Sequence, residues 1–374
     1  MTRMLRAIRV VAAVAVATAI VMAGSMSLAS AVTARKVKIP KSGVEAPPSA
    51  SLTETGSTLL YPLWNIWAPA YEQKYPQVSL TTAGTGSGTG IADAISGTVD
   101  IGSSDAYLSP TQVRATPSLL NIPLAISVQV IAYNIPGVTA HLKLSGKVLS
   151  EIYRGKITNW DNSAITALNA GVTIPSLPIV ALHRSDGSGD TFIFTQYLSR
   201  QDPSAWGKTI GYGTTVAFPA FSGALGEDGN GGMVSGCKAT IGCIAYVGIS
   251  YLSQLLGDGL TYGQLKNAKG HFELPTQTAV AAESAGFVKK TPADETLSMV
   301  DGPAAGGYPI INYEYAIVNS DQSSAKTAKA IRSVLEWAIN PRDGNSAQYL
   351  SQVSFQPLPK SVLAKSLEQI KKIR

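Results

Sequence analysis

The chain has 374 residues, of which 45% are hydrophobic and 14% are charged, and it carries a net charge of +6. This length is sufficient for two domains with buried cores. No stripe of basic residues with interleaved aromatics occurs, so nucleic-acid binding is not expected. The three histidines (His141, His183 and His271) lie far from other candidate ligands in the sequence, and no metal site is expected.

The N-terminal 31 residues have the pattern of a secretory signal peptide. Arg3, Arg6 and Arg9 precede an apolar stretch over residues 10–22, and Ala29-Ser30-Ala31 fits a cleavage site. The stretch is short for a membrane helix, so we expect an exported, extracytoplasmic protein of net charge +3. Residues 32–51 are expected to form a solvated linker, rather than a basic patch that contacts wall or membrane.

Two glycine- and serine-rich turns precede expected helices in the first part of the chain. Ser57 and Thr58 lead into a helix that carries Trp64, Trp67 and Tyr71, and Ser87 lies between a strand over residues 78–82 and a helix over residues 91–95. A further strand ends at a carboxylate, Asp105. Backbone N–H groups and hydroxyls at helix starts are suited to binding an oxyanion.

A third turn of this kind lies near the middle of the chain. A buried strand over residues 179–182 is followed by His183, Arg184 and a Gly/Ser turn, with Ser188 or Asp190 as the expected helix cap. The arginine beside the turn strengthens the prediction of an anion site. His183 at a strand end is expected to be structural rather than a general base.

Strands alternate with helices from Leu52 onward, which predicts an α/β fold with a mainly parallel sheet. Long apolar runs over residues 122–133 and 308–318 are candidates for two strands that cross between lobes. We therefore expect lobe I to comprise residues 52–130 and 310–374, and lobe II residues 131–309, with a ligand cleft between them. Within lobe II, residues 218–236 are expected to form a loop.

Cys237 and Cys243 are the two cysteines. In an exported chain we expect them to form a disulfide that closes a small surface loop, since a metal site would need more ligands.

Enzyme motifs are incomplete, so no enzymatic activity is expected. Neither Ser87 nor Ser188 lies in a Gly-x-Ser-x-Gly elbow, and Thr89 replaces the third glycine of a dinucleotide-binding fingerprint. A secreted phosphatase using Asp105 or His183 remains an alternative. A second alternative is a receptor of the same fold for another oxyanion, or one acting as a sensor.

Together, six motifs resemble the PstS family, the phosphate-binding proteins of high-affinity phosphate ABC transporters. They are residues 56–62 (Gly-Ser-Thr-Leu-Leu-Tyr-Pro), 86–88 (Gly-Ser-Gly), 100–105 (Asp-Ile-Gly-Ser-Ser-Asp), 155–160 (Gly-Lys-Ile-Thr-Asn-Trp), 184–189 (Arg-Ser-Asp-Gly-Ser-Gly) and 307–310 (Gly-Tyr-Pro-Ile). The resemblance implies a two-lobed type II periplasmic-binding-protein fold that delivers inorganic phosphate to membrane permease subunits. We expect a monomer without a cofactor.

The resemblance also implies the phosphate ligands. They are Thr58, Leu59 through its backbone N–H, Ser87, Asp105, Arg184, Ser188 and Gly189, with Ser57 in the same turn and Asp186 bracing the arginine. Two features depart from the family pattern: Asp190 stands where many members have Thr, and the signal region has no cysteine to lipidate. Asp190 is expected either to cap the helix only or to face the anion as well.

The chemistry of Asp105 suits phosphate independently of the resemblance. A buried carboxylate accepts a hydrogen bond only from an oxygen that carries a proton, which phosphate has at neutral pH and sulfate lacks. Asp105 is therefore expected to discriminate against sulfate.

Overall fold

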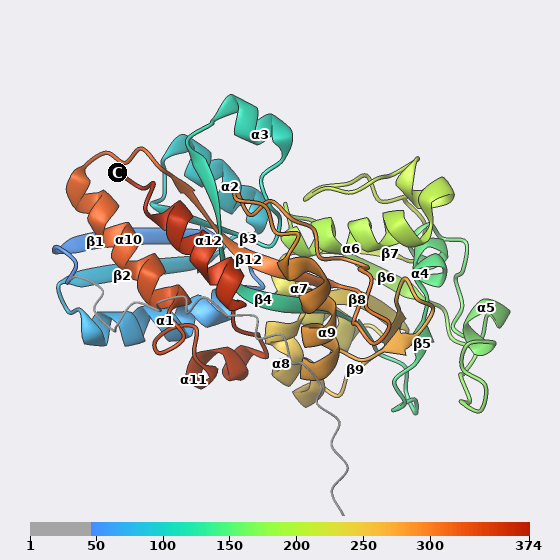
Figure 1. The fold of residues 1–374 in the computed structure, drawn as a ribbon. Helices are drawn as coiled ribbons and strands as arrows, with labels where there is room; N and C mark the ends of the chain where they lie inside the picture. Colours follow the sequence, from blue (N-terminus) through green and yellow to red (C-terminus); the bar gives the residue numbers. More distant parts are fainter. Residues whose placement is uncertain (1–45) are drawn as a thin grey trace, which may run out of the picture. The chain divides into compact units, whose positions relative to one another are not determined.

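A nine-stranded sheet is the centre of the fold, with the strand order β2-β1-β3-β12-β4-β8-β6-β7 and with β9 paired to β4 (Figure 1). The computed structural model describes residues 46–374. The strands of this sheet are β1 (Ala50–Gly56), β2 (Val78–Gly84), β3 (Ile101–Ser104), β4 (Leu119–Tyr133), β6 (Val180–Arg184), β7 (Ala224–Glu227), β8 (Cys243–Gly248), β9 (Thr261–Tyr262) and β12 (Ile311–Asn319). A second, three-stranded sheet contains β5 (Lys143–Leu144), β10 (Gln264–Lys266) and β11 (Phe272–Glu273).

The helices surround these strands. They are α1 (Tyr61–Lys74), α2 (Ser87–Ser96), α3 (Pro110–Ala115), α4 (Gly146–Tyr153), α5 (Ser163–Thr166), α6 (Gly189–Gln201), α7 (Gly229–Ala239), α8 (Leu252–Gly257), α9 (Gln277–Val288), α10 (Ala325–Ile339), α11 (Ala347–Leu350) and α12 (Lys360–Ile370). None of the helices within residues 46–374 is long and apolar enough to cross a membrane. The expected signal peptide lies outside the described residues.

Strand β4 runs through both halves of the large sheet. All 15 of its residues are buried. Its first part pairs with β12, and residues 129–133 pair with β8. The two long apolar runs are therefore strands, as expected, and both lie at the middle of the sheet (Figure 1).

The expectation of a mainly parallel sheet is wrong at its centre. β1 is parallel to β2 and β3, and β6 is parallel to β7 and β8. However, β12 is antiparallel to β3 and β4, and β4 is antiparallel to β8. A strand buried on both faces gives a continuous apolar run whatever its direction, so the sequence pattern carries no information on orientation.

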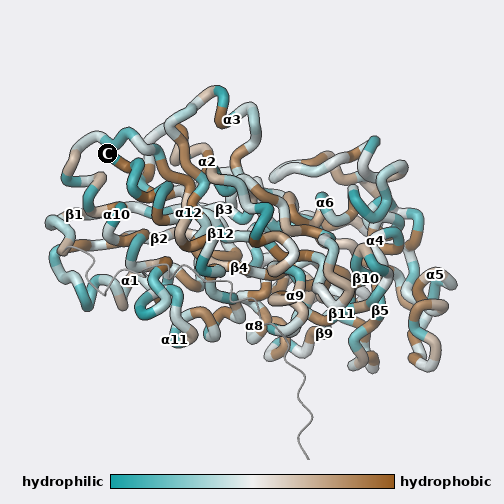
Figure 2. Tube along the Cα trace, viewed as in Figure 1, coloured by the Kyte–Doolittle hydropathy of each residue, from teal (hydrophilic) through white to brown (hydrophobic). Residues whose placement is uncertain are grey.

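The aromatic helix predicted after the first turn is α1, and its large side chains are fully buried. Trp64, Trp67 and Tyr71 are 0% exposed, and the ring of Trp67 meets that of Trp337 from α10 edge to face at 6.4 Å. Hydrophobic and hydrophilic residues alternate along α10 and α12 (Figure 2), as in helices with one face against the sheet. These contacts hold α1, and the turn before it, in a fixed position.

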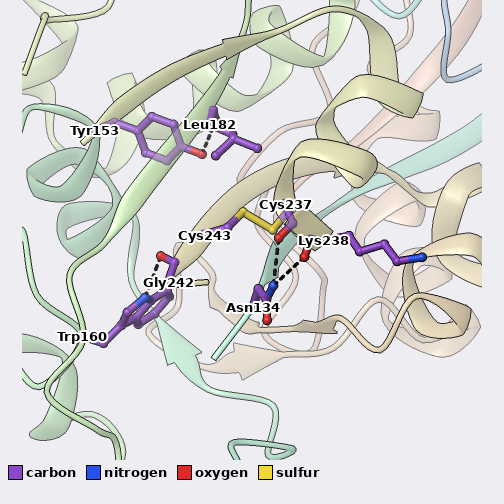
Figure 3. The surroundings of a disulfide bond; sticks show 8 residues. All are labelled: Asn134, Tyr153, Trp160, Leu182, Cys237, Lys238, Gly242 and Cys243. Atoms are coloured by element: carbon purple, nitrogen blue, oxygen red, sulfur yellow. Dashed lines mark hydrogen bonds between the residues drawn. A yellow bond between two sulfur atoms is a disulfide. The ribbon is translucent and has the colours of Figure 1, made fainter. Parts of the chain in front are cut away.

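The expected disulfide is present (Figure 3). It joins Cys237 in α7 to Cys243, the first residue of β8. Both cysteines are fully buried, although Ile241 in the loop between them is 60% exposed. The Asn134 amide donates to the carbonyls of Cys237 and Lys238, which fixes the end of α7.

Two expected boundaries are corrected. The linker was expected to extend to Ser51, but β1 already begins at Ala50, because Ala50 and Ser51 pair with β2. The loop expected over residues 218–236 contains β7 and the first part of α7. The glycines of α7 lower its helix propensity, but Met233, Val234 and Cys237 are buried against the fold and stabilise the helix.

Candidate anion-binding site

The sequence-predicted residues lie at the ends of strands and the starts of helices. Ser57, Thr58 and Leu59 connect β1 to α1, and Ser87 is the first residue of α2. Asp105 follows β3, Arg184 ends β6, and Gly189 begins α6. The chain turns sharply at Gly56, where φ is +140° and a Cβ atom would collide with the Ser103 carbonyl of β3.

The structure brings the three turns together around Asp105. The Ser57 hydroxyl donates to Asp105 Oδ1, and the Ser87 hydroxyl lies 3.4 Å from Asp105 Oδ2. A Cβ atom at Gly189 would collide with the side chains of both Asp105 and Ser87, so the start of α6 packs directly against them. The Gly88 N–H also donates to the Gly187 carbonyl at 2.8 Å. The turns predicted separately thus form one cluster.

Arg184 is buried in this cluster and is only 5% exposed. Its guanidinium donates to both carboxylate oxygens of Asp186, and its Nη1 lies 3.1 Å from Asp190 Oδ2. Burial alone would lower the pKa of Arg184, but the hydrogen bond to Asp186 and the charges of Asp190 and Asp186 raise the pKa above its usual value. Arg184 is therefore a permanent positive charge, and its guanidinium is held by the Asp186 carboxylate.

Ser188, not Asp190, is the N-cap of α6. The Ser188 hydroxyl accepts from the Thr191 N–H at 3.2 Å, which is the usual N-cap hydrogen bond. Asp190 is the second residue of the helix, and its carboxylate turns inward and is 1% exposed. Capping as the role of Asp190 is therefore wrong, because Ser188 already satisfies the N–H group that a cap would bind.

The Asp190 carboxylate accepts hydrogen bonds from three elements. Its donors are Arg184, Gln129 Nε2 at 3.1 Å and Asn230 Nδ2 at 2.6 Å. Burial, followed by the charge of Asp105, raises the pKa of Asp190 to about 7, while Arg184 and the two amides lower it. Asp190 can therefore gain or lose a proton near neutral pH.

Asn230 is a site residue that sequence reasoning missed. It is 0% exposed and belongs to the first turn of α7. Its Nδ2 donates to Thr58 Oγ1 at 3.0 Å as well as to Asp190, and its Oδ1 accepts from the Gly248 N–H at 2.7 Å. The segment was expected to be a loop, so its sequence gave no reason to select this asparagine.

Glu314 is the second missed residue. It lies on β12, is 0% exposed, and its Oε1 accepts from Ser127 and from Asn312 Nδ2 at 3.0 Å. Burial, and then the charge of Glu314, raises the pKa of Asp105 well above its usual value. A signal was available, since Asn312 and Glu314 are two polar residues on one face of an otherwise apolar strand.

Several backbone donors of the cluster have no acceptor within residues 46–374. They are the N–H groups of Thr58, Leu59, Ser87, Gly189 and Asp190, at the starts of α1, α2 and α6. Buried N–H groups are rarely left without a partner, and helix starts favour negative charge. The arrangement is therefore chemically suited to an oxyanion held by amide and hydroxyl donors.

His183 lies outside this cluster. Its ring stacks on Phe218, with 4.6 Å between ring centroids. Among residues 46–374, no group of three His, Cys, Asp or Glu side chains is placed to hold a metal ion. A pocket of about 270 Å³ lies next to the cluster, because Ala106, the residue after Asp105, is part of its lining. Tyr107, Phe192 and Tyr212 also line this pocket.

Comparisons with known proteins agree with this fold. Residues 43–342 match the model of the PBP superfamily domain. The phosphate-binding protein PstS of Pasteurella multocida is 31% identical, with 86% of this chain and 90% of that protein aligned. The PstS protein of Methanocaldococcus jannaschii is also 31% identical, over 88% of each chain. The crystal structure of a phosphate-binding protein from Stenotrophomonas maltophilia has a TM-score of 0.65 at 19% identity, covering 85% of this chain and 93% of that one.

Proposed function

Because this chain belongs to the PstS family of phosphate-binding proteins and has the type II periplasmic-binding-protein fold, we propose that it captures inorganic phosphate and delivers it to an ABC permease. The observation that carries this proposal is the set of amide and hydroxyl donors at three helix starts, gathered around Asp105 and Arg184. Phosphate requires many donors when it leaves water, and neutral donors supply them without adding charge.

In this proposal the phosphate ligands are Thr58, the Leu59 N–H, Ser87, Asp105, Arg184, Ser188 and the Gly189 N–H, with Ser57 beside them. Asp105 accepts a hydrogen bond from a protonated phosphate oxygen, which sulfate lacks at neutral pH. Asp190 acts as a second acceptor and favours phosphate with two protons. The inward orientation of its carboxylate supports this role.

We also propose that the two lobes are residues 52–130 with 310–374, and residues 131–309. β4 and β12 then form the hinge, since β4 pairs with strands of both halves. Contacts between Thr58 and Asn230, Gly88 and Gly187, and Leu59 and Ser250 would belong to the closed state, because each joins one lobe to the other. Opening of the hinge would release the ligand.

The remaining properties follow from the same role. The protein is exported, extracytoplasmic, monomeric and without enzymatic activity, and its partners are the permease subunits. The stacked His183 and the incomplete enzyme motifs support a binding protein over a phosphatase.

Equilibrium binding of radiolabelled phosphate, with sulfate as competitor, tests the proposal on protein that lacks residues 1–31. We expect tight phosphate binding, no displacement by excess sulfate, and no turnover of a phosphomonoester. Binding of sulfate with equal affinity would support a receptor for another oxyanion, and turnover of the ester would support the phosphatase alternative. Either result would contradict the proposal.

A further inference from the structure

Three buried carboxyl groups surround the candidate site, which is more than phosphate recognition by Asp105 requires. Asp105, Asp190 and Glu314 are 2%, 1% and 0% exposed, respectively. They come from the end of β3, the start of α6 and the middle of β12. Glu314 has no role in the proposed binding of phosphate.

The surroundings of Glu314 leave one of its oxygens without a donor. Ser127 and Asn312 donate to Oε1, but Oε2 has no hydrogen-bond donor among the described residues. The Asn312 amide also lies 3.4 Å from the Asp105 carbonyl, so it links Glu314 to Asp105. A buried carboxylate oxygen without a donor is unfavourable, whereas a carboxylic acid can itself donate from that position.

The charges around Glu314 are unbalanced. Asp105 and Asp190 face it from the neighbouring elements, and Asp186 contributes a further carboxylate through Arg184. Arg184 is the basic residue that interacts with this cluster in the described part of the chain. If all four carboxyl groups were ionised, the cluster would carry a net charge of −3 before any phosphate bound. An anion can enter such a site only if protons neutralise part of this charge.

The pKa of Glu314 is consistent with this need for protons in the site. Burial raises the pKa of Glu314 to about 7, although hydrogen bonds with Asp105, Ser127 and Asn312 lower it. Above pH 7 the carboxyl group is therefore mostly ionised before binding, and the arrival of a further negative charge raises its pKa again.

We propose that phosphate binding takes up a proton from solvent, and that the Glu314 carboxyl group holds this proton beside Asp105. This inference rests on the proposed function. The proton adds to a carboxylate oxygen of Glu314 and forms an O–H bond, and no bond in the protein breaks. The hydrogen bond from the phosphate hydroxyl stabilises the ionised form of Asp105, whose pKa burial and Glu314 otherwise raise, and the proton then resides on Glu314. Glu314 is thus a positioning residue that sets the protonation of the site.

The pH dependence follows from this linkage. Below about pH 6, Glu314 is already protonated and takes up no further proton. Between about pH 7 and 8.5 its uptake approaches one proton, and phosphate affinity falls by up to about tenfold per pH unit through this group.

Isothermal titration with inorganic phosphate, in buffers of different ionisation enthalpy from pH 6 to 8.5, measures the protons taken up. The wild type is compared with Glu314→Gln. Phosphate can itself change its ionisation on binding to either protein, so the difference in proton uptake between the two proteins reports on Glu314. We expect the wild type to take up more protons at pH 8, by close to one, and to show the steeper loss of affinity with pH. Equal uptake and equal slopes in the two proteins would overturn the inference.

Two further variants complete the test. Glu295→Gln is a matched control, because Glu295 is also 0% exposed and bonded to a serine but lies outside the cluster, and it should leave proton uptake unchanged. Ser127→Ala keeps the Glu314 carboxyl group but removes a donor to its ionised form, so it should shift the pH range of uptake upward. If Glu314→Gln does not fold, an unshifted range in Ser127→Ala overturns the inference.

The wild type by itself separates this inference from the proposed function. Phosphate binding without any proton uptake at pH 8 would overturn the role of Glu314 and leave the proposed function standing. Absence of phosphate binding would contradict the proposed function itself.

Discussion

Replacing Asn230 with alanine tests how the two proposed lobes are held together over the ligand. The side chain of Asn230 donates to Thr58 of lobe I and to Asp190 of lobe II, and it accepts from the Gly248 N–H. Asn230→Ala removes all three side-chain bonds but keeps the backbone N–H that lies 3.2 Å from Thr58 Oγ1.

The expected magnitudes follow from these bonds. Loss of a donor to the charged Asp190 costs about 1.5–3 kcal/mol, and the Gly248 N–H left without an acceptor costs a further 1–3 kcal/mol or so. We therefore expect the free energy of unfolding to fall by about 3–5 kcal/mol. The bond to Thr58 joins the two lobes, so its loss of about 1 kcal/mol should weaken phosphate binding roughly five- to tenfold, mainly through faster dissociation.

Urea unfolding without phosphate measures the first quantity, and phosphate titration with stopped-flow dissociation measures the second. Asn134→Ala is a matched control, because its amide also donates two hydrogen bonds, but to the carbonyls of Cys237 and Lys238 away from the site. The control should lose stability and keep its affinity. If Asn230→Ala is destabilised but dissociates from phosphate at the wild-type rate, the bridging role of Asn230 is refuted.

Three further predictions concern single features of the chain. Asp105→Asn should weaken the discrimination against sulfate more than it weakens phosphate binding, because an amide can donate to a fully deprotonated anion. Competition between phosphate and sulfate for the variant measures this, and unchanged rejection of sulfate would falsify the role of Asp105. Burial raises the pKa of Asp190 to about 7, so Asp190 is protonated below this pH, and phosphate loses its second proton above it; affinity should therefore be greatest near pH 7 and fall toward pH 8.5; calorimetry on Asp190→Thr should give a flatter profile, whereas identical profiles would exclude contact with the anion. Replacing Cys237 and Cys243 together with serine should lower the free energy of unfolding by about 2 kcal/mol, as expected for so short a loop, with little effect on phosphate affinity; urea unfolding of both forms checks this, and an unchanged midpoint would contradict it.

Local sequence signals were sufficient to predict the parts of the site that lie within single turns. The strand-to-helix turn predicted after residues 179–182 contains Arg184 and Ser188, and the turn before the first helix contains Ser57 and Thr58. The roles of Asp186 and Gly189 were implied by the family resemblance. These residues are close in sequence, so their geometry depends on φ and ψ preferences, capping and the start of an amphipathic helix, all of which act over a few residues. The long apolar runs also predicted the central strands β4 and β12, because a strand buried on both faces is apparent from a continuous run of neighbouring apolar residues.

Only the tertiary structure decided which buried polar groups meet these turns. Asn230 reaches Thr58 across 172 positions of the chain, and Ser127 reaches Glu314 across 187. No local preference encodes such pairs, because they depend on strand order and on the antiparallel direction of β12. That direction brings Glu314 to the buried centre of the sheet, and burial there gives its carboxyl group a pKa near neutrality. The sequence alone therefore predicted the turns in which the backbone and hydroxyl donors lie, whereas the charge balance around them arises from the fold.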